Sequence, residues 1–358
     1  MKDVTELPYL DERKAAILKA IVQDYISDGE PVGSKRLADE WDLGVSPATV
    51  RSDMAALEEA GFITHPHTSA GRVPTDKGYR FYVDSLTGTA ELSLEQRTAL
   101  ERLLLRSTDL EELLRRTSGV LSRLTRFAAL VAAPRLDRSR LRHVELVQLA
   151  PTSVLAVFIA DTGRVEKRML DLDAPVAEPE VGRAGHAVNE AAAGLRLTQA
   201  FDVISGVGAG APPEVRGLMD AVAEAVRSGL VGPPSEQVFV GGTAHIAGEG
   251  YFHELEQVKQ VFETLEEQVV VLRMLRAALE AGDPAVRIGT ELALDELAAC
   301  SVVAARYDAG DATGSLGVLG PTRMDYPRTL AAVQAVASSL EKALAELTPG
   351  GSAAAGGA

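Results

Sequence analysis

The chain has 358 residues, which predicts two or three domains, and its 46% hydrophobic and 24% charged residues exclude a wholly disordered protein. The single cysteine, Cys300, excludes an intramolecular disulfide and a cysteine-based zinc site. The net charge of −15 argues against a protein that coats nucleic acid generally, because affinity for DNA depends on neutralising phosphates.

The two ends of the chain carry further signals. The N-terminus is charged where a signal peptide has an apolar core, and no apolar run reaches the roughly 18 residues of a membrane span. We therefore expect a cytoplasmic protein that does not enter a membrane. The low-complexity segment at residues 348–358 is expected to be a disordered tail.

Three helices are predicted near the start of the chain. The first covers residues 11–27 and ends at Gly29. The second begins with Ser34 as its N-cap and ends at residues 43–44. The third begins with Ser46 as its N-cap and Pro47 at its first helical position. Helix, short helix, turn and helix in this order are typical of a helix-turn-helix motif.

The third helix has two contrasting faces at the helical period. Val50, Met54 and Leu57 form its predicted core face. The opposite face is small and polar, with Arg51 at its flank; it comprises Ala48, Thr49, Ser52 and Ala55. Small side chains let a helix lie deep in a major groove, and hydroxyls can bond base edges or phosphates. This pattern favours the outer face as a DNA-reading surface.

A wing is predicted after the third helix. Strand signals at residues 62–63 and 72–73 flank a turn-like segment, and Thr75 then caps a further helix. Residues 62–82 carry a local charge of +2, whereas residues 1–88 as a whole carry −5. The histidines at 65 and 67 lack a third ligand, so we expect no metal there.

The rest of the chain alternates between helix and strand signals. A helical segment at 91–128 precedes strand patterns, and a Pro- and Ala-rich block then separates these from a second helix-strand set. The predicted strands are 127–133, 142–149, 153–160, 164–170, 237–242, 285–289, 300–307 and 315–319, and the later helices are 181–195, 213–228, 251–281 and 327–347. This order predicts one α+β domain with an insertion.

Four segments together resemble one known family. The run VRSDMAALEEAGFITHPHTSAGRVPTDKGYRFYVD resembles the signature of the HrcA heat-inducible transcription repressors. Segments 241–247, 286–291 and 320–328 resemble the later motifs of that family, in the same order. One departure is Ala244, where the family usually has asparagine.

The resemblance implies a multidomain α+β protein that acts as a homodimer. It implies an N-terminal winged helix-turn-helix at 1–88, a GAF-like domain formed by 89–175 and 251–347, and an inserted dimerisation domain at 176–250. Members of the family bind an inverted-repeat operator upstream of chaperone operons. The chaperonin promotes the active repressor, and heat draws the chaperonin away.

The resemblance also assigns DNA contacts to matching residues. The third helix presents five residues to the major groove: Ser46, Ala48, Thr49, Arg51 and Ser52. Arg72 of the wing is a candidate for minor-groove or phosphate contact. Lys35, Arg36 and Lys77 are phosphate candidates.

No cofactor, metal or catalytic set is expected from the sequence. The glycine cluster at 206–210 is followed by Ala211 and two prolines, which delay a helix and argue against a dinucleotide loop. One alternative remains open at this point: a metabolite-responsive winged-helix repressor with a small effector in the GAF-like domain.

Overall fold

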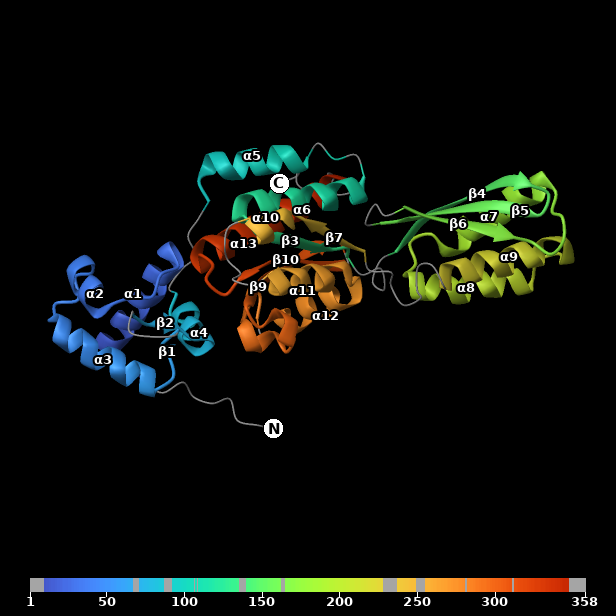
Figure 1. Ribbon diagram of the computed structural model, residues 1–358. Coiled ribbons are helices and arrows are strands. Elements are labelled where there is room, and N and C mark those ends of the chain that lie inside the picture. The colour runs from blue at the N-terminus through green and yellow to red at the C-terminus, as the bar shows by residue number, and fades with distance from the viewer. Residues whose placement is uncertain are drawn as a thin grey trace.

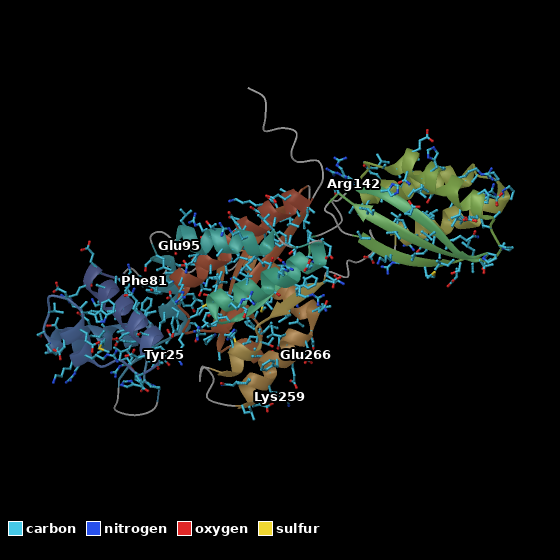
Figure 2. The ribbon with its side chains drawn as sticks, turned by 90° about the horizontal axis from the view of Figure 1, so that it is seen from above. Tyr25, Phe81, Glu95, Arg142, Lys259 and Glu266 are labelled. Atoms are coloured by element: carbon cyan, nitrogen blue, oxygen red, sulfur yellow. The ribbon has the colours of Figure 1, made fainter. Side chains whose placement is uncertain are left out.

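A computed structural model describes residues 10–66, 71–86, 92–105, 107, 109–134, 140–161, 165–227, 237–248, 255–280, 282–310 and 312–347. Three units follow one another in a row: an N-terminal unit, a central unit and an outer unit (Figure 1). The view from above shows the same row, with Tyr25 and Phe81 in the N-terminal unit and Arg142 in the outer one (Figure 2). The predicted tail, most of the wing turn and the turn at 162–164 lie outside the described residues.

The N-terminal unit contains the predicted helices and strands in the predicted order. Its elements are α1 (Glu12–Asp28), α2 (Ser34–Glu40), α3 (Pro47–Glu59), β1 (Ile63–Thr64), β2 (Val73–Pro74) and α4 (Asp76–Asp84). Strands β1 and β2 pair antiparallel. Two predictions for α2 were wrong. Its N-cap residue is Gly33 and not Ser34, and the helix ends at Glu40 rather than at residues 43–44.

The central unit is built on a five-stranded antiparallel sheet of order β7-β3-β10-β9-β8. Its strands are β3 (Ala128–Ala132), β7 (Val238–Gly241), β8 (Ala285–Ile288), β9 (Cys300–Ala309) and β10 (Ala312–Pro321). Its helices are α5 (Leu94–Leu104), α6 (Leu110–Thr125), α10 (Ala244–Gly248), α11 (Leu255–Glu266), α12 (Gln268–Leu279) and α13 (Tyr326–Leu347), with short 3-10 helices η3 (Gly289–Leu292) and η4 (Asp295–Leu297).

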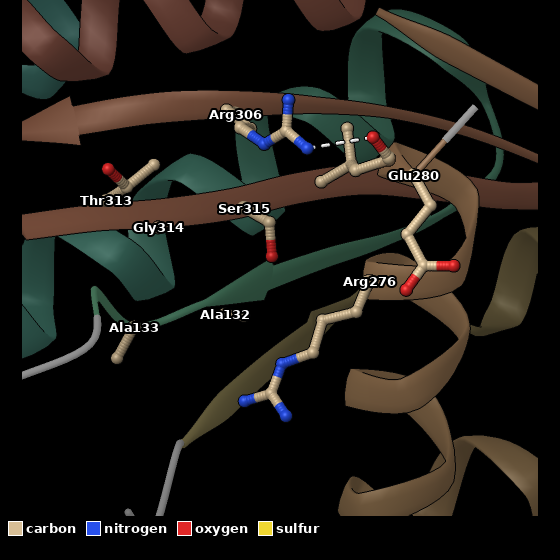
Figure 3. A pocket seen from close by; sticks show the side chains of 9 residues that line it. Ala132, Ala133, Arg276, Glu280, Arg306, Thr313, Gly314 and Ser315 are labelled. Atoms are coloured by element: carbon tan, nitrogen blue, oxygen red, sulfur yellow. Dashed lines mark hydrogen bonds between the residues drawn. The ribbon is translucent and has the colours of Figure 1, made fainter. Parts of the chain in front are cut away.

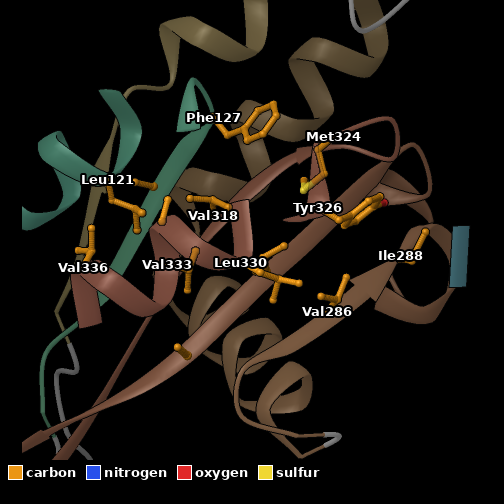
Figure 4. Packing of buried hydrophobic residues seen from close by; sticks show 14 of the residues in the cluster. Leu121, Phe127, Val286, Ile288, Val318, Met324, Tyr326, Leu330, Val333 and Val336 are labelled. Atoms are coloured by element: carbon orange, nitrogen blue, oxygen red, sulfur yellow. The ribbon is translucent and has the colours of Figure 1, made fainter. Parts of the chain in front are cut away.

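Each face of this sheet carries its own core. On one face, α13 and α6 pack on the sheet, where Leu330 and Val333 lie near Val318 of β10 (Figure 4). On the other face, α12 packs on the strands, and α11 packs against α12 and η4. The prediction of a single helix over 251–281 was wrong. Glu267 leaves the helical conformation and separates α11 from α12. The break lets the buried sides of both helices reach the same core.

The outer unit folds around a separate core. It comprises β4 (Leu141–Ala150), β5 (Ser153–Ala160), β6 (Val165–Asp171), α7 (Glu178–Ala192), α8 (Leu197–Ala209) and α9 (Pro213–Ala225). Its sheet has the order β4-β5-β6 and is covered on one face by the helices.

The observed packing differs from the predicted boundaries at 175/176 and 250/251. The strands β4–β6, predicted within the first part of the GAF-like domain, form one core with α7–α9. The strand β7, predicted within the insert, pairs with β3 of the central sheet. The composition change near residue 174 marks the passage from strands to helices inside one unit, which explains why it misplaces the boundary.

Candidate nucleic-acid interface

Helix α3 has the two faces that its period predicts. Ser46 caps the helix, since its hydroxyl accepts a hydrogen bond from the Thr49 backbone N–H. Val50, Met54 and Leu57 are buried in the core. The outward residues Ser46, Ala48, Arg51, Ser52 and Ala55 are exposed, and Thr49 is half-buried. The helix therefore presents a shallow, mostly uncharged surface to solvent.

A buried carboxylate on the inner side of α3 fixes the helix to α1. Asp53 is buried, and its two oxygens accept bonds of 2.8 and 3.1 Å from the Arg13 guanidinium. This hydrogen bond raises the pKa of Arg13. This pair was not predicted from the sequence, although a carboxylate beside Met54 on the apolar side of a helix requires a hydrogen-bonding partner. A two-bonded guanidinium resists rotation of α3 about its axis.

Two cations near α3 are free among the residues that the structure describes. Lys35 of α2 and Arg51 of α3 are both exposed and have no ion-pair or hydrogen-bond partner in the described ranges. No carboxylate of the described residues therefore offsets their charges. Both remain available to an anionic ligand such as a phosphate group.

The neighbouring Arg36 is in the opposite situation. Its guanidinium binds Asp24 at 2.8 Å and Glu40 at 3.1 Å, and it also contacts Asp28. Hydrogen bonds to Asp28 and Glu40 hold the pKa of Arg36 well above its ordinary value. Burial raises the pKa of Asp24, one of whose oxygens has no hydrogen-bond partner. Three acidic groups therefore surround this cation.

The predicted wing cations are also engaged within the N-terminal unit. Arg72 Nε donates to Glu58 at 2.9 Å, and the His65 ring contacts the same carboxylate. Lys77 Nζ donates to the Ala60 carbonyl at 2.9 Å and lies 4.4 Å from the centre of the Phe62 ring. These contacts join the strands and α4 to the end of α3.

The outer side of this region is formed by the exposed α3 face together with Lys35 and Arg51. Within the described ranges, no three His, Cys, Asp or Glu side chains gather closely enough to hold a metal ion. Among the same residues, none of the helices has the length and apolar character needed to cross a bilayer. Arg51, at the flank of the exposed helical face, has no ion-pair or hydrogen-bond partner in the part of the chain that the structure describes.

Comparison with known proteins identifies the family. The model of the HrcA protein C-terminal domain matches residues 111–330. A "Heat-inducible transcription repressor HrcA" of Streptomyces avermitilis is 46% identical over 94% of this chain and 99% of the relative. Another of that name, from Acidothermus cellulolyticus, is 47% identical over the same shares. A crystal structure titled as a hypothetical protein shares the fold, with a TM-score of 0.64, 23% identity and coverage of 95% of this chain and 100% of that one. The chain therefore belongs to the HrcA family of heat-inducible transcription repressors.

Proposed function

We propose that this chain represses heat-shock genes by binding an inverted-repeat operator as a homodimer, and that residues 1–88 act as a winged helix-turn-helix DNA-binding domain. The observation that carries the proposal is the outer face of α3. Small residues and Arg51, which has no partner among the described residues, lie there opposite a buried apolar face. Such a helix fits the major groove without steric hindrance. Repression follows from occupying the promoter and needs no chemical step.

We assign the DNA contacts in two tiers. Ser46, Ala48, Thr49, Arg51 and Ser52 enter the groove, and Lys35 contacts a phosphate. Arg36, Arg72 and Lys77 remain phosphate candidates, but each already binds a group of its own domain. A cation shared with a carboxylate attracts phosphate less strongly, so these three form the weaker tier.

The proposed dimer surface is the uncovered face of β4–β6. One apolar row crosses the three strands and consists of Val147, Leu155 and Met169. Val147 is 41% exposed and Met169 is 54% exposed. An adjacent row places Glu145 and Lys167 on either side of Val157. A second copy related by a two-fold axis would cover the apolar row and could pair the opposite charges.

A charge placed in this row tests the dimer. Met169→Asp should shift the protein to a monomer in sedimentation velocity and lower operator affinity by at least about a hundredfold, because each monomer then binds one half-site alone. Glu178→Asp, a conservative change on the helical side, serves as the control. A dimer that survives Met169→Asp would place the interface elsewhere.

The regulatory steps are proposed from family membership. We place the chain in the cytoplasm, in contact with chromosomal DNA. The central unit would correspond to the GAF-like domain, and the chaperonin would promote the active form until heat stress draws it away. Adding purified chaperonin should raise the operator-binding fraction of the repressor, and unfolded protein should reverse that gain.

Fluorescence anisotropy tests the main proposal. Full-length protein, with and without chaperonin, is titrated into an inverted-repeat duplex from a chaperone promoter and into a scrambled duplex of equal length. We expect at least about a thousandfold preference for the inverted repeat, the lower end of specificity for site-specific binders. Equal affinity for the two duplexes, with folded dimer present, would contradict repression through an operator.

A second candidate function rests on a pocket of about 340 Å³ at the end of α12. Arg276, Arg306, Thr313 and Ser315 line it, and Arg306 donates to the Leu279 carbonyl (Figure 3). The lining thus holds two arginines and one carboxylate, Glu280, and this excess of positive charge favours a small anionic effector. Such an effector would make the protein a metabolite-responsive repressor. A thermal-shift screen of carboxylated and phosphorylated metabolites separates the two candidate functions. A compound that stabilises the protein and also alters its operator affinity would favour the metabolite-responsive repressor.

A further inference from the structure

Three sequence motifs that lie far apart in the chain meet where the N-terminal unit joins the central unit. They are TDKGYR at 75–80, VRIGTE at 286–291 and GPTRMDYPR at 320–328. Helix α4 lies between the N-terminal helices and the central sheet, and it contacts β8 (Figure 1). The proposed DNA contacts do not involve the two later motifs, so this junction requires its own explanation.

Asp76, the first residue of α4, is held by the turn after β8. One oxygen of its carboxylate accepts two hydrogen bonds of 2.9 Å from Thr290, one from the backbone N–H and one from the hydroxyl. Gly289 has a φ of +52°, and a Cβ there would come within 2.3 Å of the Asp76 carboxylate. The turn therefore fits this carboxylate only with glycine at position 289.

Arg80 lies one helical turn later on the same face of α4. Its Nε donates to Glu291 at 2.8 Å, and one Nη donates to both the Val286 carbonyl, at 2.7 Å, and the second Glu291 oxygen. The two side chains are only 23% and 26% exposed. Glu291 also accepts the Ile288 N–H at 3.0 Å, which fixes the carboxylate on the central unit. A two-bonded, partly buried pair of this kind defines both distance and angle.

The third motif adds an apolar contact. The rings of Tyr79 and Tyr326 lie 6.1 Å apart, and both are buried. Close by, Gly29 at the end of α1 leaves room for the Arg323 guanidinium, which would stand 2.4 Å from a Cβ at position 29. The N-terminal unit is thus fixed to the central unit by four separate contacts, although the chain connects the two units only once.

We propose that Asp76 and Arg80 are positioning residues that hold the DNA-binding domain at one orientation on the central unit, and thereby set the half-site spacing that the dimer accepts. This inference rests on the proposed function. In a dimer joined through the outer units, the separation of the two α3 helices depends on every rigid joint between them. Half-sites lie on the same DNA face only at separations near whole helical turns. A dimer with a rigid joint should therefore bind operators of altered spacing weakly.

Variants on the central-unit side of the junction test the inference without changing the DNA-binding domain. Glu291→Gln combined with Thr290→Val removes the charge and the hydroxyl that α4 contacts. Glu296→Gln, an exposed carboxylate in the same region, is the matched control. Affinity is measured for the operator, for a single half-site, and for operators whose central spacer is lengthened or shortened by a few base pairs.

We expect the double variant to bind the single half-site like the wild type and to bind the natural operator about tenfold more weakly. Its preference for natural over altered spacing should shrink at least tenfold, whereas the control keeps the wild-type preference. A double variant with the wild-type spacing preference would overturn the inference. A merely destabilised protein would lose half-site binding as well, and that result would also count against a positioning role.

A distance measurement without DNA separates this inference from the proposed function. Spin labels at Ala55→Cys on α3 and Ala345→Cys on α13 report the orientation of the N-terminal unit, since both positions are exposed and Cys300 is buried. We expect a narrow distance distribution in the otherwise wild-type chain and a broad one with Glu291→Gln and Thr290→Val. Equal widths would overturn the inference even if operator binding were confirmed. If the protein bound no operator, the proposed function would be contradicted. The widths of the two distance distributions would still show whether Glu291 and Thr290 hold the N-terminal unit at one orientation.

Discussion

The outer face of α3 and the group of cations around it illustrate two uses of charge in one small domain. The α3 face carries one arginine, Arg51, with no partner in the described part of the chain. Arg36 and Arg72, only a short distance away in sequence, bind carboxylates of the same domain. A positive residue type in the sequence therefore does not by itself mark a DNA contact, because its local carboxylates decide how much charge reaches the solvent.

This contrast also gives the net charge of −15 a structural meaning. In the N-terminal unit, acidic residues pair with the cations that a general DNA-coating protein would leave free. Non-specific affinity, which depends on the number of phosphates neutralised, should then be low. Specific affinity would come from the helix face and from two half-sites bound at once.

The largest expected effect comes from placing a negative charge on the α3 face. Ser52→Glu should lower operator affinity at least about a hundredfold, because a carboxylate would be desolvated against bases and phosphates. The melting temperature should stay within a few degrees of the wild type, since Ser52 is exposed. Anisotropy titration measures the operator affinity, and thermal unfolding measures the melting temperature.

Ser338→Glu makes the same change at an exposed position of α13 and should leave operator affinity unaltered. Retained affinity in Ser52→Glu would mean that another surface reads the operator. Equal losses in both variants would point to the overall charge of the protein as the cause.

Arg51 and Arg72 compare the two regions directly. Arg51→Ala should lower operator affinity about tenfold and reduce the salt dependence of log K by up to about one, because its charge, when bound, displaces counterions from the DNA. Arg72→Ala should have the smaller effect on both quantities, because Glu58 already neutralises part of its charge. Titrations at four salt concentrations give the two slopes.

The same pair can contradict the two-tier assignment. If Arg72→Ala reduced the salt slope more than Arg51→Ala, Arg72 would have to leave Glu58 on binding DNA. Glu58→Gln distinguishes this case, since releasing Arg72 should then strengthen operator binding.

A smaller effect is expected on stability, because one of the acidic groups around Arg36, Asp24, is buried. Burial raises the pKa of Asp24 above the ordinary 3.8, so the folded state binds more protons than the unfolded state just above that pH. The contribution of Asp24 to stability therefore falls as the pH rises through this window. Asp24→Asn should raise the melting temperature by at most a few degrees at pH 7 and by less near pH 4.

Thermal unfolding of both proteins from pH 4 to pH 7 measures this difference. Arg36 keeps Asp28 and Glu40 in the variant, which limits any loss from the missing charge. An advantage of Asp24→Asn that grew toward acid pH would contradict the raised pKa.

The sequence predicted those features that depend on local periodicity. The two faces of α3 follow from the spacing of Val50, Met54 and Leu57, and the cap follows from Ser46 before Pro47. Sheet membership was not predictable in this way, because β7 pairs with β3 across more than a hundred residues. Strand patterns reveal alternation but not the partner strand.

The candidate site shows the same limit. The exposed face of α3 was predicted. Glu58 lies 14 residues from Arg72, however, and the buried Asp24 lies 12 residues from Arg36, so these contacts depend on how the helices pack. The contact of Asp76 with Thr290 spans 214 residues. The motifs around both residues signalled a special role, and only the fold brings them together.

The most direct test of the central claim is disulfide trapping between α3 and the operator. Ser52→Cys is incubated with duplexes that carry a thiol tethered to one base, moved step by step through a half-site. Cys300 does not compete, because burial raises the pKa of its thiol to about 12. We predict efficient capture at one or two neighbouring bases of the inverted repeat and none in a scrambled duplex. Equal capture from both duplexes, or none from the inverted repeat when binding is saturated, would contradict the assignment of α3 as the reading helix.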